Sequence, residues 1–144
     1  MIIDAFNDLN WVAVAVSTIA AFAIGLVWFA PPVLGTLWAR QVTQYAGIPE
    51  ADVTGGAAKG TTLLPWFVAT AINVVALALA VEATGAESLA DGIVFGVVLS
   101  LGFGATLNSW PSIFARLPRM WWLLNCGAAL LMNSVAGAIL GAWQ

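Results

Sequence analysis

The side chains most able to do chemistry in this sequence are four asparagines that lie inside long apolar stretches. They are Asn73, Asn108, Asn125 and Asn133. A carboxamide both donates and accepts hydrogen bonds, and its burial in hydrocarbon is costly unless those bonds are made. The sequence leaves two interpretations open: the amides join neighbouring helices, or they line a passage for a small neutral solute.

Acid–base, redox and metal chemistry have little support in this composition. The chain contains no histidine, and there is no Asp, Glu, Lys or Arg in its four apolar blocks, Trp11–Ala30, Leu63–Val81, Gly92–Trp110 and Met120–Trp143. The single cysteine, Cys126, can form neither an intrachain disulfide nor a zinc site by itself, so we expect it to be a packing residue. Arg116 and Arg119 suggest at most a clamp for a lipid headgroup, which makes an interfacial lipid enzyme the least favoured interpretation. We therefore predict that the protein is not an enzyme and has no catalytic residue, metal or cofactor.

The elements that must position the asparagines are four apolar stretches, each long enough to cross a bilayer as a helix. About 20 residues with a rise of about 1.5 Å each cover the hydrocarbon core of a membrane. Hydrophobic residues make up 62% of the 144 and charged residues only 8%, which would be an unusual composition for a water-soluble domain. We predict an all-α polytopic integral membrane protein with a single domain over residues 1–144. Its four transmembrane helices should span approximately residues 11–30, 63–82, 91–110 and 119–143.

Residues at the edges of these stretches predict where the helices begin and end. The pair Pro31-Pro32 should close the first span, because proline has no amide N–H to continue the helix. Gly85 should end the second span, since glycine adopts the left-handed conformation without strain. Ser88 followed three residues later by Asp91 resembles a capping box that opens the third span.

The four cationic side chains predict the orientation in the membrane. Arg40 and Lys59 lie between the first and second spans, and Arg116 and Arg119 lie between the third and fourth. Because loops rich in Lys and Arg stay in the cytoplasm, we predict an inner-membrane protein with the N-terminus and the C-terminus outside. The expected contacts are with membrane lipids. A net charge of −3 with no basic patch argues against a nucleic-acid partner.

The first cytoplasmic loop contains one amphipathic helical pattern. Its apolar positions follow the spacing of a single helix face, with Thr36, Arg40, Gln41 and Gln44 on the other side. The apolar set is Leu34, Leu37, Trp38, Val42 and Tyr45. We predict an amphipathic helix lying in the inner membrane interface, with a partner-binding helix as the alternative.

Small residues recur at every fourth position on three spans, the first, the third and the fourth. Such ladders let two helix backbones approach closely. They include Gly92, Gly96, Gly104, Gly137 and Gly141. The sequence does not decide between packing within one chain and the seam of a homo-oligomer.

Short motifs along the chain resemble those of a known family. The fourth span carries Leu124-Asn125-Cys126-Gly127 and the run 136–143, the first has Asn10-Trp11 and the run 25–31, and the loop has 47–52 followed by Lys59-Gly60. With these motifs the chain resembles an uncharacterised bacterial four-helix membrane protein family, domain of unknown function 1761. The resemblance implies four spans and no assigned activity, and it supplies no catalytic or binding residues.

Taken together, the packing ladders and the lack of reactive groups favour a non-enzymatic membrane protein. Our leading hypothesis is self-association through the glycine-rich helix faces, as a homo-oligomer or an accessory subunit. The alternative is a passive channel or transporter for a small neutral solute, lined by the four membrane asparagines.

Overall fold

The computed structural model describes residues 2–57 and 59–143, and the side chains of 3–53 and 59–143. This part of the chain is helical and contains no strand, which confirms the predicted all-α class. In chain order the elements are α1 (Ile2–Asp8), α2 (Trp11–Trp28), η1 (Pro31–Gly35), α3 (Thr36–Ala46), α4 (Glu50–Ala57), α5 (Gly60–Thr84), α6 (Leu89–Leu99), η2 (Ser100–Ala105), α7 (Thr106–Phe114) and α8 (Arg119–Ala142).

Four helical rods are long and apolar enough to cross a membrane, as the sequence predicts. They are α2, α5, α8 and the continuous rod Leu89–Phe114 that α6, η2 and α7 form together. The chain is therefore a multi-pass membrane protein. The second rod begins at Gly60, three residues before the approximate start at residue 63. Uncharged residues on the N-terminal side of Pro65 continue the helix there. The third reaches Phe114 and passes Pro111, which removes one backbone donor without ending the helix.

The predicted helix ends are present in the structure. Ser88 is the N-cap of α6, and its hydroxyl oxygen accepts from the backbone N–H of Asp91 at 3.1 Å. Gly85 follows α5 in the left-handed conformation, with φ of 64°. Asn10 caps α2, since its carboxamide oxygen accepts from the backbone N–H groups of Val12 and Ala13.

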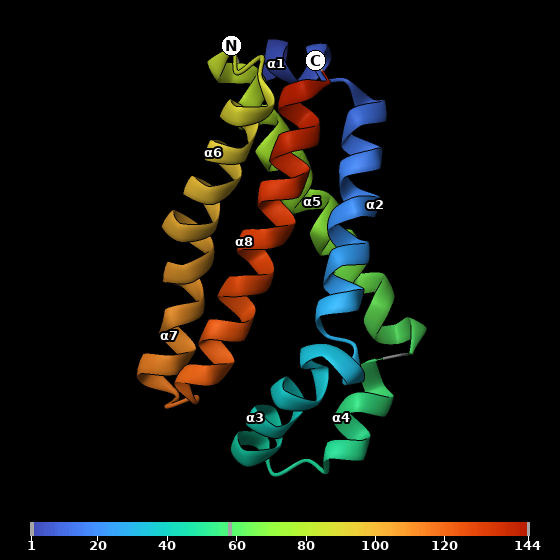
Figure 1. Cartoon of the computed structure of the whole chain (residues 1–144), viewed down its shortest axis with the longest axis vertical. Coiled ribbons are helices and arrows are strands. Elements are labelled where there is room, and N and C mark those ends of the chain that lie inside the picture. Colours follow the sequence, from blue (N-terminus) through green and yellow to red (C-terminus); the bar gives the residue numbers. More distant parts are fainter. Residues whose placement is uncertain (1, 58, 144) are drawn as a thin grey trace.

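Helix α8 is the central rod of the bundle. In Figure 1 the rod α6–η2–α7 lies on one side of α8 and α2 on the other, with α5 behind them. Both chain termini lie at one end, which we call the terminal end. The opposite end, which carries α3, α4 and the connection from α7 to α8, is called the cationic end.

The glycine ladders bring α6 and α8 into close backbone contact. A side-chain carbon added at Gly92 would lie 2.7 Å from the carbonyl carbon of Gly137, and one at Gly96 would lie 2.6 Å from that of Asn133. At Gly141 it would lie 3.0 Å from the backbone nitrogen of Gly92. Only glycine permits this approach, so four of the five predicted ladder glycines form a seam within one chain. Gly104 is different, because its nearest neighbour is the Ala129 side chain at an ordinary 3.6 Å.

The buried core lies toward the terminal end, between α2, α5 and α8. Val74, Leu77 and Val81 of α5 are completely buried there, against Ala13 of α2 and Ala136 of α8. Toward the cationic end α7 packs against α8, and the candidate site lies between α5, α8 and the η2–α7 segment.

The described chain contains two π-helical turns that its sequence did not predict, one after the first rod and one within the third. The turn η1 begins with Pro31-Pro32 and carries the chain from α2 into α3. The turn η2 lies in the middle of the third rod and includes Gly102 and Gly104. Such turns are rare in helices and occur frequently at functional sites.

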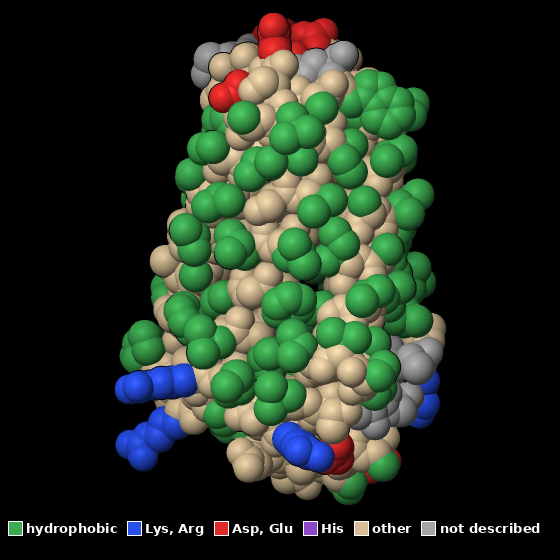
Figure 2. All heavy atoms as spheres, viewed as in Figure 1, with side chains coloured by type: hydrophobic (Ala, Val, Ile, Leu, Met, Phe, Trp, Pro, Cys, Tyr) green, Lys and Arg blue, Asp and Glu red, His purple; other side chains and the backbone are tan. Residues whose placement is uncertain are grey.

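Charges divide between the two ends of the molecule. Figure 2 shows Lys and Arg side chains at the cationic end and an apolar belt along the flank. Arg40 lies in α3, Lys59 precedes α5, and Arg116 and Arg119 flank the connection between α7 and α8. All four cations therefore lie at one end, whereas the identity of the membrane and the side that this end faces stay predictions.

The loop helix forms as α3 over Thr36–Ala46 and ends at Gly47, whose φ of 67° is left-handed. It buries Ala39 and half-buries Trp38 and Val42, while Tyr45 is exposed. Its position in a bilayer interface stays a prediction.

Candidate functional site

A cavity of about 560 Å³ lies between α5, the η2–α7 segment and α8. All four asparagines singled out from the sequence line it: Asn73, Asn108, Asn125 and Asn133. Apolar side chains and Thr70 complete the lining, among them Phe29, Trp66 and Phe103. Its size falls within the range of small-molecule sites, which are mostly apolar with a few polar groups.

Two of the asparagines belong to a hydrogen-bonded chain that crosses three rods. Nδ2 of Asn73 on α5 donates to Oδ1 of Asn133 on α8 at 2.6 Å. Nδ2 of Asn133 donates to the Ser100 hydroxyl at the start of η2 at 3.0 Å. That hydroxyl donates to the backbone carbonyl of Ala129 at 3.0 Å. The chain thus joins α5, α8 and the third rod at the middle of the bundle.

The direction in which donors and acceptors alternate along this series of hydrogen bonds follows from its last member, the Ala129 carbonyl. A backbone carbonyl only accepts, so the single Ser100 proton is committed to Ala129 and its oxygen must accept from Asn133. The amide nitrogen of Asn133 therefore faces Ser100 and its oxygen faces Asn73. Asn73 must in turn present its nitrogen to Asn133, so its own oxygen points away from this hydrogen bond.

The other two asparagines bond only to their own helices. Nδ2 of Asn108 donates to the carbonyl of Gly104 at 2.8 Å, and Nδ2 of Asn125 donates to that of Trp121 at 2.7 Å. Both bonds run back four residues, and the carbonyl acceptors again fix the amide orientation. Within residues 2–57 and 59–143, no donor reaches the carboxamide oxygens of Asn73, Asn108 or Asn125. Three acceptors therefore remain without partners beside the cavity.

The mouth of the cavity lies on the flank of the bundle. The exposed lining residues are on α5 and on the η2–α7 segment, and they include Asn73, Phe103 and Leu107. Toward the terminal end, the buried core around Val74 and the glycine seam close the space. The cavity is therefore a pocket with one closed end and is not a passage through the bundle.

None of the described residues that line the cavity is acidic, basic or a cysteine. The arrangement can hold a molecule through amide hydrogen bonds, aromatic faces and apolar contact. Its lining groups do not exchange protons at neutral pH. In the described part of the chain, no group of three or more His, Cys, Asp or Glu could hold a metal.

The cationic residues lie outside this cavity. Nε of Arg40 is 3.6 Å from a Glu50 carboxylate oxygen, in an exposed pair between α3 and α4. Arg116 and Arg119 are exposed, and within the described residues neither has an ion pair. Arg116 has a left-handed φ of 57° where the chain turns from α7 to α8.

Sequence reasoning missed the aromatic wall of the site. Phe29 ends α2 and Trp66 lies near the start of α5, yet both line the cavity. Trp122 lies outside the cavity lining, and its indole N–H donates to the Ala105 carbonyl of η2 at 2.9 Å, which ties that turn to α8. Tryptophan near the end of a span indicates a membrane interface, so its position in the sequence alone does not reveal such internal contacts.

Comparison with known protein families matches residues 12–141 to the family described as a protein of unknown function, DUF1761. The chain belongs to the DUF1761 family. This confirms the resemblance found in its motifs. No curated protein and no solved structure matches the chain.

Proposed function

We propose that this DUF1761 protein is a non-enzymatic inner-membrane protein that binds a small uncharged molecule in the asparagine cavity. The observation that carries the proposal is a set of three carboxamide oxygens that receive no donor from the described residues, beside a cavity of about 560 Å³. At membrane depth, lipid tails offer no hydrogen bonds, so an unpaired amide is costly. A molecule with hydroxyl or amide N–H groups would satisfy these oxygens.

The chemistry of the lining supports an uncharged ligand. An ion would need compensating charge once it left water, and the described lining residues carry none. Each amide nitrogen also keeps a second N–H beyond the bond described above, so the site offers both donors and acceptors. Polar neutral molecules fit this pattern better than hydrocarbons or salts.

The closed end of the cavity favours binding or carriage over passive conduction. A pore would have to pass the completely buried Val74, Leu77 and Val81. We propose that the cationic end faces the cytoplasm, with both termini outside, because cationic loops remain on that side. The asparagine cavity would then lie in the cytoplasmic half of the bilayer.

The test is whether the cavity is wet. In a Cys126→Ala background, Asn125→Cys and Leu123→Cys are compared for their rates of alkylation by N-ethylmaleimide, which is uncharged and crosses membranes. Leu123 is 52% exposed on the flank of the same helix and lines no described cavity, so it is the matched control. Alkylation needs the thiolate, which forms in water and not in hydrocarbon. We expect Asn125→Cys to react at least about tenfold faster. Equal rates would remove the proposal.

Self-association is a second proposal, with a different supporting observation. Asn73 is exposed on the flank beside the apolar Ile72, and a second copy covering that flank would withdraw the amide from lipid. Four of the ladder glycines are occupied by the seam between α6 and α8, so a seam between copies would use other residues. Crosslinking through Ile72→Cys in membranes would detect such a dimer, and a monomer at every protein density would exclude it.

A further inference from the structure

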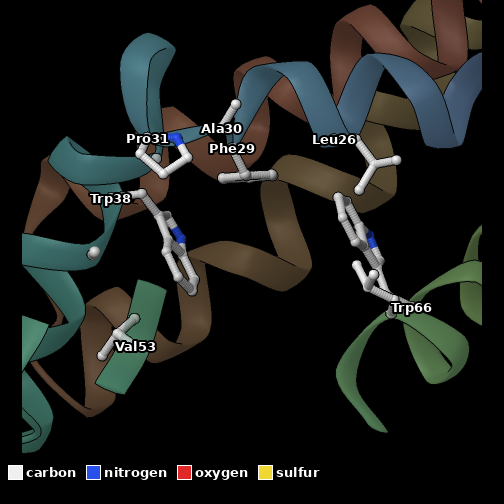
Figure 3. Close-up of a pocket in the computed structure, with 10 residues that line it drawn as sticks. Leu26, Phe29, Ala30, Pro31, Trp38, Val53 and Trp66 are labelled. Atoms are coloured by element: carbon white, nitrogen blue, oxygen red, sulfur yellow. The ribbon is translucent and has the colours of Figure 1, made fainter. Parts of the chain in front are cut away.

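A second cavity of about 340 Å³ lies at the cationic end, between α2, η1, α3, α4 and α5 (Figure 3). Its lining is mainly apolar and includes Leu26, Pro31 and Val53. Two residues, Phe29 and Trp66, line both this cavity and the asparagine cavity. The two spaces are therefore neighbours that share one aromatic wall.

The wall is part of a row of packed rings. The Phe29 and Trp66 rings meet edge to face, with centroids 6.0 Å apart. Trp66 also packs on Phe22 at 5.0 Å, and Phe29 packs on Trp38 at 5.6 Å. In Figure 3, Trp38 and Trp66 stand on opposite sides of the cavity with Phe29 between them. Aromatic contacts at these distances are weakly attractive, so they can hold the rings of the wall together and still separate reversibly.

A glycine provides the space in which Trp66 lies. A side-chain carbon at position 25 would come within 2.7 Å of the indole, so any residue other than glycine would push the ring. Gly25 belongs to the run that resembles the family motif, and the helix face it presents to α5 is buried. The position of Trp66 therefore depends on the absence of a side chain on the opposing helix.

Both rings stand beside breaks in regular helix. Phe29 is the C-cap of α2, just before the π-helical turn η1. Trp66 directly follows Pro65, which removes a backbone hydrogen bond from the first turns of α5. Residues at the ends of elements are where hinges absorb changes in backbone angle. The shared wall is thus attached where the regular helix of α2 ends and where α5 lacks one backbone hydrogen bond.

The closed arrangement also leaves one polar group unsatisfied. The indole N–H of Trp38 is buried, and it has no acceptor among the residues that the structure describes. An unpaired buried donor costs free energy that contact with water would recover. An opening that admits water beside Trp38 therefore loses less stability than the ring contacts alone would suggest.

We propose that Phe29 and Trp66 form a gate between the two cavities, and that the cavity at the cationic end is the vestibule through which a polar solute reaches the asparagines. This inference rests on the proposed function, since it supplies the route to that binding site. A route through the vestibule keeps a polar solute out of the lipid that faces the mouth on the flank. The gate opens when the Trp66 ring moves away from Phe29 and out of the space that Gly25 leaves for it.

The test measures access to the asparagine cavity from water at the cationic end. Asn108→Cys in a Cys126→Ala background is treated with a charged methanethiosulfonate reagent, which does not cross lipid, in vesicles that expose the cationic end. Trp66→Ala and the milder Trp66→Phe are then added separately. Phe67→Ala is the matched control, because Phe67 is the next residue of α5, packs on the same Phe22 ring at 5.1 Å and lines neither cavity.

We expect modification to accelerate by about tenfold with Trp66→Ala, by less with Trp66→Phe, and to stay unchanged with Phe67→Ala. Equal rates in the variants with and without Trp66 would overturn the gate and leave the binding site standing. The same holds if Phe67→Ala accelerates the reaction as much as Trp66→Ala does. If no variant is modified, and Asn125→Cys is alkylated no faster than Leu123→Cys, both the binding site and the gate are overturned.

Discussion

Replacing Asn133 with alanine should destabilise the bundle more than the same change at any other cavity asparagine. Asn133 is buried, and its carboxamide makes two bonds between rods, accepting from Asn73 at 2.6 Å and donating to Ser100 at 3.0 Å. Both bonds disappear in Asn133→Ala. The variant also leaves the Asn73 nitrogen without its acceptor on the flank of the bundle.

The expected magnitude follows from the number of bonds lost. Hydrogen bonds between membrane helices contribute on average about 0.6 kcal/mol each and at most about 1.7. Two such bonds place the loss between about 1 and about 3.5 kcal/mol. Asn125→Ala removes the same atoms from the same helix but only one bond, which lies within α8, so we expect a loss below about 0.6 kcal/mol.

The assay is reversible unfolding in mixed micelles, in which the fraction of a denaturing detergent is raised and helix content and tryptophan fluorescence are followed. Ser100→Ala and the double variant complete a thermodynamic cycle with Asn133→Ala. The double variant should lose less than the sum of the two single variants, because the two side chains share one bond. The reasoning is refuted if Asn125→Ala costs as much as Asn133→Ala, or if the cycle is additive.

Two further predictions concern the seam and the charged end. Gly96→Ala should lower the free energy of unfolding by about 1–3 kcal/mol in the same assay, because the added carbon meets the α8 backbone. The control is Gly102→Ala on the same rod, where the added carbon meets nothing within 4 Å. It should be neutral or stabilising by less than about 1 kcal/mol. Equal effects would show that the seam is not tight. Arg40→Cys and Arg116→Cys should react with an impermeant thiol reagent in inverted membrane vesicles and not in intact cells. Labelling of the two positions from opposite sides would contradict the placement of all four cations at one end.

The spans were predictable because an apolar run of sufficient length has one stable form in lipid, the helix. The ends were predictable where one residue has a special conformation, as at Gly85 and Ser88. The π-helical turns were not, since no residue type requires them. The turn η2 is bonded to α8 at both of its ends. Ser100, its first residue, donates to the Ala129 carbonyl, and Ala105, its last residue, accepts from the Trp122 indole.

The site was predictable in its residues but not in its geometry. Carboxamides in an apolar stretch indicate a need for hydrogen bonds, and that argument identified the four asparagines that line the cavity. Which of them pair depends on the relative rotation of helices, which a single sequence does not give. Phe29 and Trp66 are far apart in the chain. They meet because the C-terminal end of α2 lies beside the N-terminal part of α5.

The central position of α8 has a consequence for how this protein is made. In chain order α8 follows the other three rods, yet α2 and α6 pack on opposite sides of it. The ribosome therefore delivers three helices to the bilayer before the one that joins them has been synthesised. During that interval the hydroxyls of Ser17 and Ser100 lack the α8 carbonyls to which they donate in the finished fold. The contacts that unite the bundle can therefore form only after synthesis of the last helix, so assembly of the core is a late step in the production of this protein.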